Sequence, residues 1–191
     1  RYDLPRFVNM VESRGGQVKT REVPLEWGKK IDIPLADWYK PRPEQVDALD
    51  YAVNNTNSMR CLALQPGFGK TSISIVSASR IGRRVLIKTP ILVNQWIGAI
   101  KKFTKLEDDD IYVISGSASL ARLISEIDKT IFPKIILAAV QTMRSYAQRE
   151  APYHIFPRIE DFCNLCDIGI VVSDEVHLFF HTGLMLDMML N

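Results

Sequence analysis

The sequence predicts an α/β fold in which a parallel β-sheet is covered by helices on both faces. Short apolar segments alternate along the chain with longer segments of helical spacing, and this alternation is typical of βαβ units. The apolar segments lack a strict alternation of apolar and polar residues, as expected for strands that are buried on both faces. A glycine-rich loop also lies between a predicted strand and a predicted helix, at residues 65–71.

The individual strands and helices follow from these patterns in order. A first helix is expected from Pro43 to Val53, where Val46, Leu49 and Val53 share one face. The predicted strands are Cys61–Leu64, Val85–Lys88, Ile111–Ile114, Ile135–Ala139 and Ile168–Val172. The predicted helices after them are Lys70–Ala78, Val93–Phe103, Leu120–Ile127, Gln141–Ala147 and Leu184–Leu190. Together these elements predict one domain over residues 41–191.

Residues 1–40 differ from the rest and predict a small N-terminal appendage or the end of a preceding module. A short helix is expected from Leu4 to Val11. Val18–Val23 and Lys30–Ile33 are expected to be short strands around a turn at Trp27–Gly28. The chain does not begin with methionine, and we expect it to be part of a longer protein.

The composition is that of a globular protein with a hydrophobic core. Of the 191 residues, 47% are apolar and 24% are charged, and the formal net charge is +2. A net charge so near zero neither requires nor excludes nucleic acid as a partner, so any basic binding surface would be local. No apolar run approaches the roughly 18 residues needed to cross a bilayer. The cysteines are Cys61, Cys163 and Cys166, and this odd number favours a reduced, intracellular protein, with Cys61 in a buried strand.

The loop at residues 65–71 has the sequence Gln-Pro-Gly-Phe-Gly-Lys-Thr and predicts a phosphate-binding loop for ATP. Gly67 and Gly69 allow backbone amides to approach phosphate oxygens with no Cβ in the way. These amides and the start of the following helix favour anions. Lys70 is expected to reach the β- and γ-phosphates, and Thr71 is expected to hold Mg²⁺ through its hydroxyl.

Two adjacent carboxylates follow the last predicted strand. Asp174 and Glu175 begin the segment Asp-Glu-Val-His directly after that apolar run. A nucleotide hydrolase needs such a pair opposite its phosphate loop. Asp174 would ligate Mg²⁺, because this ion prefers hard oxygen ligands. Glu175 would orient or deprotonate the attacking water.

These two segments together resemble motifs I and II of superfamily 2 helicases and translocases, and the second has the Asp-Glu-x-His form of one branch. Arg42–Gln45 is similar to the Arg-Pro-x-Gln segment upstream of motif I in that branch. Residues 89–96, Thr-Pro-Ile-Leu-Val-Asn-Gln-Trp, resemble motif Ia of the XPB, UvsW and chromatin-remodeller group. Residues 140–143, Val-Gln-Thr-Met, match the place of the next DNA-contacting motif.

The resemblance implies a RecA-like P-loop domain over residues 41–191 that binds ATP and Mg²⁺. The nucleotide-binding residues that it implies are Arg42, Gln45, Pro66, Gly67, Phe68, Gly69, Lys70, Thr71 and Ser72. The catalytic residues that it implies are Lys70, Asp174, Glu175 and His177, of which His177 couples hydrolysis to the nucleic acid. Thr71 and Asp174 would hold the Mg²⁺ ion. The residues expected to contact one nucleic-acid strand are Thr89, Pro90, Gln141 and Thr142.

Two departures from the family pattern affect the expected activity. Leu64 stands where the eight-residue phosphate-loop pattern has a small residue. The chain to Asn191 also lacks motif III and the second RecA-like domain, whose arginine finger contributes orders of magnitude to turnover. We expect the full-length protein to carry that second domain, and we expect this chain alone to bind nucleotide weakly and hydrolyse it poorly.

The sequence therefore predicts an ATP-dependent DNA helicase or translocase that uses ATP hydrolysis to move along or remodel DNA. Double-stranded or branched DNA is expected in preference to RNA. Two alternatives stay open, namely the same motor within a restriction or remodelling complex, and a binding module of this fold without turnover. A zinc site at Cys163, Cys166, His177 and His181 is a weaker alternative, because residues 168–172 between its ligands are expected to form a buried strand.

Overall fold

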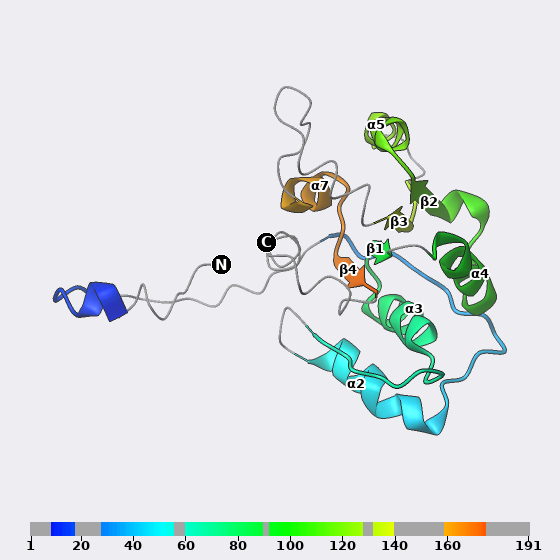
Figure 1. The fold of residues 1–191 in the computed structure, drawn as a ribbon, viewed down its shortest axis with the longest axis horizontal. Coiled ribbons are helices and arrows are strands. Elements are labelled where there is room, and N and C mark those ends of the chain that lie inside the picture. Colours follow the sequence, from blue (N-terminus) through cyan, green and yellow to red (C-terminus); the bar gives the residue numbers. More distant parts are fainter. Residues whose placement is uncertain are drawn as a thin grey trace. The chain divides into compact units, whose positions relative to one another are not determined.

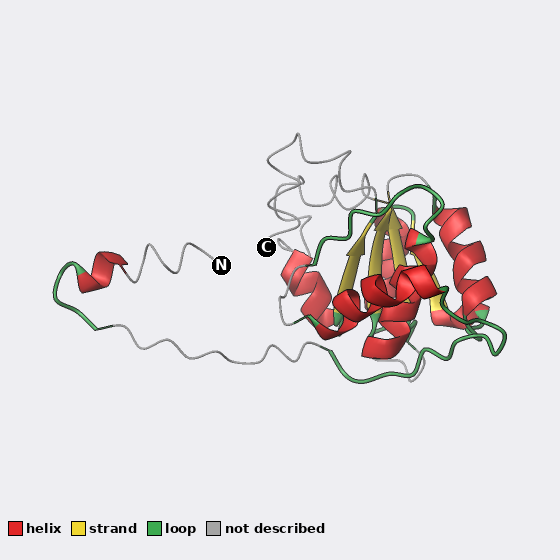
Figure 2. Ribbon diagram, turned by 90° about the horizontal axis from the view of Figure 1, so that it is seen from below, coloured by secondary structure: helices red, strands yellow, loops and turns green. Residues whose placement is uncertain are grey.

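Among the residues that the structure, a computed structural model, describes, a four-stranded sheet has helices on both faces (Figures 1 and 2). The structure describes residues 9–17, 28–55, 60–89, 92–127, 132–139 and 159–174. The chain divides into two compact units, and the sheet lies in the unit from Trp27 to Val176. The other unit comprises Arg1–Glu26 and His177–Asn191, and its described part is helical at residues 9–12.

The sheet is parallel throughout its described strands, which confirms the predicted α/β fold. The strands are β1 (Val85–Thr89), β2 (Ile111–Ile114), β3 (Ile135–Ala139) and β4 (Ile170–Ser173). Their order is β2-β3-β1-β4, and in register Val85 lies beside Ile135 on one side and Ile170 on the other. Parallel strands place their carboxyl ends at one edge of a sheet, so the residues directly after them gather there.

Helices cover both faces of this sheet. The α-helices are α2 (Val46–Asn54), α3 (Lys70–Ile81), α4 (Val93–Phe103), α5 (Ser117–Ser125) and α7 (Ile159–Leu165). Two short 3₁₀ helices, η1 (Pro43–Gln45) and η2 (Asp108–Asp110), precede α2 and β2. Figure 1 shows α3 and α4 on one face of the sheet, and α5 and α7 on the other. None of the helices in the described segments is both long and apolar enough to cross a membrane.

The main hydrophobic core lies between the sheet and the pair α3 and α4. Ile87 of β1 packs there with Ile75 of α3 and with Trp96 and Ile100 of α4, and none of the four side chains is more than 2% exposed. The alternation of side chains along a strand places Lys88 on the opposite face. The burial of β1 over its whole length explains why its sequence shows no polar alternation.

The predicted strand Cys61–Leu64 is wrong, because the structure gives this segment no strand assignment. A parallel strand is held by hydrogen bonds to its neighbours, and among the described residues no ladder includes this segment. Leu62 and Leu64 instead pack against a buried cluster formed by Leu49, Ile73 and Val76. Cys61 is exposed, which also corrects the expectation that it lies in a buried strand.

The predicted strand Lys30–Ile33 is likewise wrong, because it is reduced to one antiparallel bridge between Lys30 and Arg83. This segment nevertheless packs tightly, since Ile33 is only 1% exposed and belongs to the main core. Farther along, the amide of Ala36 donates to the carbonyl of Phe103 at 2.9 Å. By their contacts residues 28–40 belong to the unit that contains the sheet, which begins at Trp27.

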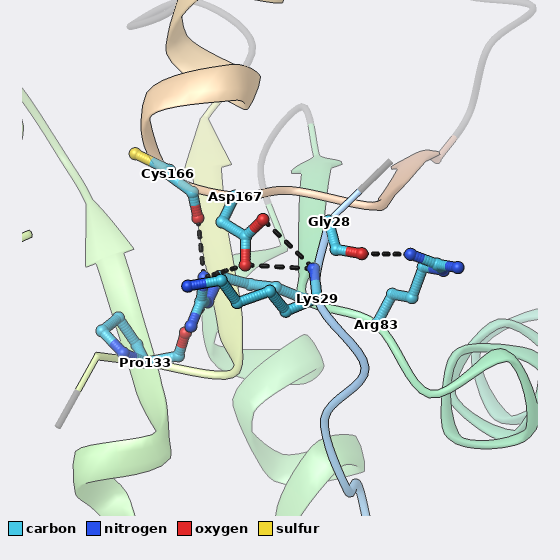
Figure 3. A network of polar contacts seen from close by, with 7 residues as sticks. Gly28, Lys29, Arg83, Pro133, Cys166 and Asp167 are labelled. Atoms are coloured by element: carbon cyan, nitrogen blue, oxygen red, sulfur yellow. Dashed lines mark hydrogen bonds and ion pairs between the residues drawn. The ribbon is translucent and has the colours of Figure 1, made fainter. Parts of the chain in front are cut away.

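A network of polar contacts ties this N-terminal segment to the amino-terminal edge of the sheet (Figure 3). Arg84, directly before β1, donates to the carbonyl oxygens of Pro133 and Cys166 at 2.8 and 2.9 Å. Its guanidinium also lies 3.4 Å from Asp167 Oδ2. Asp167 in turn accepts from the amide of Lys29, with both carboxylate oxygens at 3.1 Å. Burial lowers the pKa of Arg84, and the charge of Asp167 opposes that shift.

The other expected elements differ in outcome. The predicted helices near residues 43–53, 70–78, 93–103 and 120–127 are confirmed as η1 with α2, α3, α4 and α5. Val18–Val23, Gln141–Ala147 and Leu184–Leu190 lie outside the described residues, as does most of Leu4–Val11. Helix α7 is a further short helix that precedes β4.

Candidate nucleotide-binding site

The phosphate loop is a turn that only glycine accommodates without strain at two positions. Gly67 and Gly69 have φ angles of 80° and 92°, in the left-handed region that other residues avoid. The amide of Phe68 donates to the carbonyl of Gln65 at 3.2 Å and closes the turn. A Cβ added to Gly69 would lie 2.5 Å from Gln45 Nε2 and 2.9 Å from the hydroxyl of Ser72. The backbone conformation therefore favours glycine, and a Cβ here would also displace the side-chain ends of Gln45 and Ser72.

Two side chains from outside the loop hold it in this shape. Arg42 donates from Nη2 to the carbonyl of Phe68 at 2.6 Å and to that of Gly67 at 3.3 Å. Gln45 donates from Nε2 to the same Phe68 carbonyl at 2.8 Å, and its Oε1 accepts from the amide of Arg42 at 3.1 Å. In this structure both side chains therefore bind the loop itself.

Helix α3 begins at the loop and offers its N-terminus to an anion. Gly69 is the N-cap, and Lys70 and Thr71 are the first two helical residues. Lys70 is exposed and Thr71 is half-buried, so both can be reached from the loop side. The hydroxyl of Ser72 is buried and donates to the carbonyl of Gly69 at 2.9 Å, where it supports the loop. Unpaired amides and the helix dipole make such a start a phosphate site.

Leu64, the departure from the usual phosphate-loop pattern, has a structural role. Its side chain is half-buried and packs on the cluster of Leu49 in α2 and Ile73 and Val76 in α3. Leucine at this position therefore anchors the segment before the loop to α2 and α3. It does so without a neighbouring strand among the described residues.

Asp174 lies at the carboxyl edge of the sheet, directly after β4. Its amide donates to the carbonyl of Lys88 in β1 at 3.0 Å, which extends the pairing of the two strands by one residue. Residues 82–84 connect α3 to β1, so α3 runs antiparallel to the strands and begins toward the edge that carries Asp174. The topology therefore brings the phosphate loop and this carboxylate to the same edge of the sheet.

One side chain fixes the Asp174 carboxylate directly. Trp96 of α4 donates from its indole Nε1 to Asp174 Oδ2 at 3.0 Å. The Trp96 ring is only 2% exposed and belongs to the main core. The sequence predicts a packing role for Trp96, and its link to the acidic motif was missed, because spacing along a chain does not show which acceptor an indole meets.

The expected nucleic-acid contacts are only partly described. Thr89 ends β1, but its side chain is 0% exposed, and its hydroxyl has no partner among the residues that the structure describes. Pro90, Gln141 and Thr142 lie outside the described residues, and so do the catalytic candidates Glu175 and His177.

The cysteines of the weaker zinc alternative are buried thiols on the face of the sheet opposite α3 and α4. Cys163 and Cys166 are 5% and 1% exposed and come from α7 and the turn after it. Burial, with a smaller contribution from Cys163, raises the pKa of Cys166 to about 12, although Arg84 opposes the shift. A cysteine binds zinc as the thiolate, and a raised pKa disfavours that form. Within the described segments, no group of three or more histidine, cysteine or acidic residues is placed to hold a metal ion.

The chain was compared with known protein families and with curated proteins. Residues 38–183 match the family described as "Type III restriction enzyme, res subunit". The chain belongs to this family. No curated protein matches the chain. Members of the type III restriction res-subunit family have a P-loop domain of the RecA fold that resembles superfamily 2 helicases, which agrees with the observed sheet.

The family assignment also places this res-subunit family member in a chemical class. Domains of this family are ATP-dependent motors of the helicase or restriction-enzyme type, and they typically use ATP and Mg²⁺. The residues present fit those groups, because the loop exposes a helix N-terminus with Lys70, and Thr71 and Asp174 supply hard oxygen ligands.

Lys88 is a second feature of this family member that the sequence did not predict. It lies within the central strand β1, and only 6% of it is exposed. Burial lowers its pKa, and the nearby Cys163 opposes that shift. The only signal in the sequence is one lysine within the apolar run from residue 85 to residue 88.

Proposed function

We propose that this chain is the first motor domain of an ATP-dependent DNA helicase or translocase. The observation that carries the proposal is the pairing of a phosphate loop with a carboxylate at one edge of a parallel sheet. Asp174 directly follows β4, at the carboxyl edge of the sheet. The phosphate loop and the start of α3 lie toward the same edge. The family match supports a nucleotide-driven motor of this class.

The reaction is the hydrolysis of ATP by water to ADP and phosphate. The amides of Gly67–Gly69 and the N-terminus of α3 would hold the phosphates, and Lys70 would contribute its positive charge to the β- and γ-phosphates. Thr71 and Asp174 would hold Mg²⁺, which neutralises charge on the transferred phosphoryl group. Glu175 would orient the water or accept its proton, and His177 would couple hydrolysis to the nucleic acid.

The macromolecular partner of the motor is DNA, with double-stranded or branched DNA preferred to RNA. Gln141 and Thr142 would contact one strand through backbone amides and polar side chains, and the loop at Thr89 and Pro90 would lie against the same strand, without reading bases. A second RecA-like domain in the full-length protein would close on the nucleotide and complete the site. A protein with these roles would act inside a cell.

A second candidate is the same motor as a subunit of a restriction complex. It is favoured by the family to which the chain belongs, that of the res subunit of type III restriction enzymes. The two candidates differ in their products, because a restriction motor acts with a nuclease. ATP-dependent cleavage of DNA by the purified complex would favour the second candidate, and ATP-dependent strand separation without cleavage would favour the first.

ATP hydrolysis with and without DNA tests the proposal in the full-length protein. We expect DNA to stimulate hydrolysis, and we expect Glu175→Gln to bind nucleotide but lose at least about 100-fold in rate, as is typical when a general base is removed. Hydrolysis that DNA does not stimulate would contradict the motor assignment, and nucleotide binding without any hydrolysis would favour the binding module. A rate retained in Glu175→Gln would remove Glu175 from the mechanism.

A further inference from the structure

The hydrogen bond between Trp96 and Asp174 links the hydrophobic core to the acidic motif. The indole nitrogen lies 3.0 Å from Asp174 Oδ2, a distance typical of an N–H···O hydrogen bond. A buried indole N–H needs an acceptor, and a backbone carbonyl would satisfy it equally well. Here the acceptor is the carboxylate that is expected to hold Mg²⁺, and a bond to a charged acceptor is among the stronger ones.

The donor has little freedom to move. Trp96 is 2% exposed and packs with Ile87 of β1 and Ile100 of α4 in the main core. The acceptor is also held through its backbone, since the Asp174 amide donates to Lys88 at 3.0 Å. With backbone and one carboxylate oxygen both fixed, rotation about the Cβ–Cγ bond of Asp174 is restricted. This arrangement presents the carboxylate in one orientation.

We propose that Trp96 is a positioning residue that orients the Asp174 carboxylate for Mg²⁺. The inference rests on the proposed function, because that function gives Asp174 its metal. Partners that orient metal ligands by hydrogen bonds typically change metal affinity when they are removed. Without the indole N–H the carboxylate would rotate more freely, and the ion would bind an ensemble of orientations less tightly.

The variant Trp96→Phe removes the donor and keeps an aromatic ring in the core. We expect it to need about tenfold more Mg²⁺ than the natural protein for half-maximal binding of a fluorescent ATP analogue. Binding of the analogue without Mg²⁺ should not change. Tyr112→Phe is the matched control, because it removes an aromatic donor that bonds the Ser119 carbonyl at 2.7 Å, on β2 and α5. We expect the control to keep the natural Mg²⁺ dependence.

A second measurement does not depend on the folding of that variant. Within residues 1–191, Trp96 becomes the single tryptophan when Trp27→Phe and Trp38→Phe are combined. In that background we expect Mg²⁺, added with saturating nucleotide, to shift the emission of Trp96. Asp174→Asn should abolish the shift.

The outcomes distinguish the positioning role of Trp96 from the proposed function of the domain. An unchanged Mg²⁺ dependence in folded Trp96→Phe, or an emission that Mg²⁺ does not alter, would overturn the positioning role and leave the proposed function intact. Failure of the natural protein to bind the ATP analogue at any Mg²⁺ concentration would overturn the proposed function instead.

Discussion

The shape of the phosphate loop depends on residues outside it as well as on its glycines. Arg42 and Gln45 both donate to the carbonyl of Phe68, at 2.6 and 2.8 Å. The side-chain nitrogen Nε2 of Gln45 also lies where a Cβ at position 69 would be placed. Backbone conformation and side-chain contacts therefore require the same residue at this position.

Substitution of Gly69 by alanine should destabilise the protein. The left-handed φ of 92° and the contact with Gln45 both oppose a Cβ there. We expect Gly69→Ala to lower the free energy of unfolding by about 2–3 kcal/mol, measured by urea denaturation.

Gly98→Ala is the matched control for this substitution. Gly98 is exposed within α4, and a Cβ there would meet no atom within 4 Å. Because alanine favours helix more than glycine does, we expect the control to raise the free energy of unfolding by about 0.5–1 kcal/mol. Equal effects of the two substitutions would contradict the contact-based explanation.

The cysteines should differ in reactivity toward a thiol reagent. At pH 8 we expect Cys61, which is exposed, to react at once, and Cys166 to stay unreactive until the protein unfolds. The thiolate is the reactive form, and burial raises the pKa of Cys166 to about 12. Equal labelling rates of all three cysteines in the folded protein would contradict this arrangement.

The raised pKa of Cys166 also predicts how stability depends on pH. Above the ordinary thiol pKa of about 8.5, unfolding releases the Cys166 proton, so the free energy of unfolding should fall as pH rises.

At the next level of organisation, Arg84 and Asp167 join three segments at the amino-terminal edge of the sheet. They link β1, the turn after α7 and the segment that begins at Gly28. Asp167 has a φ of 54°, which aspartate tolerates better than most residues. The conformation of Asp167 and its charge both contribute to this junction.

Loss of the Asp167 carboxylate should therefore be costly. Asp167→Ala leaves Arg84 without its carboxylate partner and the Lys29 amide without its acceptor. We expect the free energy of unfolding to fall by about 2–3 kcal/mol, measured by denaturation.

An exposed ion pair provides the comparison for Asp167→Ala. Asp108 pairs with Lys101, but 84% of its side chain is exposed. Because exposed pairs contribute little, Asp108→Ala should change stability by less than about 1 kcal/mol. A cost for Asp108→Ala as large as that for Asp167→Ala would show that the network has no special role.

For the molecule as a whole, the parallel sheet could be predicted because apolar runs bounded by helices signal buried strands. The segment from Cys61 to Leu64 shows where that reasoning fails. Its apolar residues signal burial, but burial against α2 and α3 differs from hydrogen bonding in a sheet, and only strand neighbours distinguish the two. Residues 28–40 show the same limit, because packing between distant segments leaves no local pattern.

The site could be predicted in its residue types but not in its contacts. The glycines, Lys70, Thr71 and Asp174 were predicted from sequence, and the structure places the loop at the start of α3 and Asp174 after β4. The contact of Trp96 with Asp174 joins residues 78 positions apart, and no periodicity encodes such a meeting. The hydrogen bonds from Arg42 to the carbonyls of Gly67 and Phe68 are likewise not encoded in any local pattern.

The central claim is that Gly67–Thr71 binds the phosphates of Mg²⁺-ATP. Calorimetric titration of the protein with ATP and Mg²⁺, repeated with Lys70→Ala, tests it most directly. We predict saturable binding by the natural protein that Lys70→Ala weakens by about tenfold or more, because a hydrogen bond between charged groups is lost. Equal affinity in the two proteins, or no binding by the natural protein, would contradict the claim.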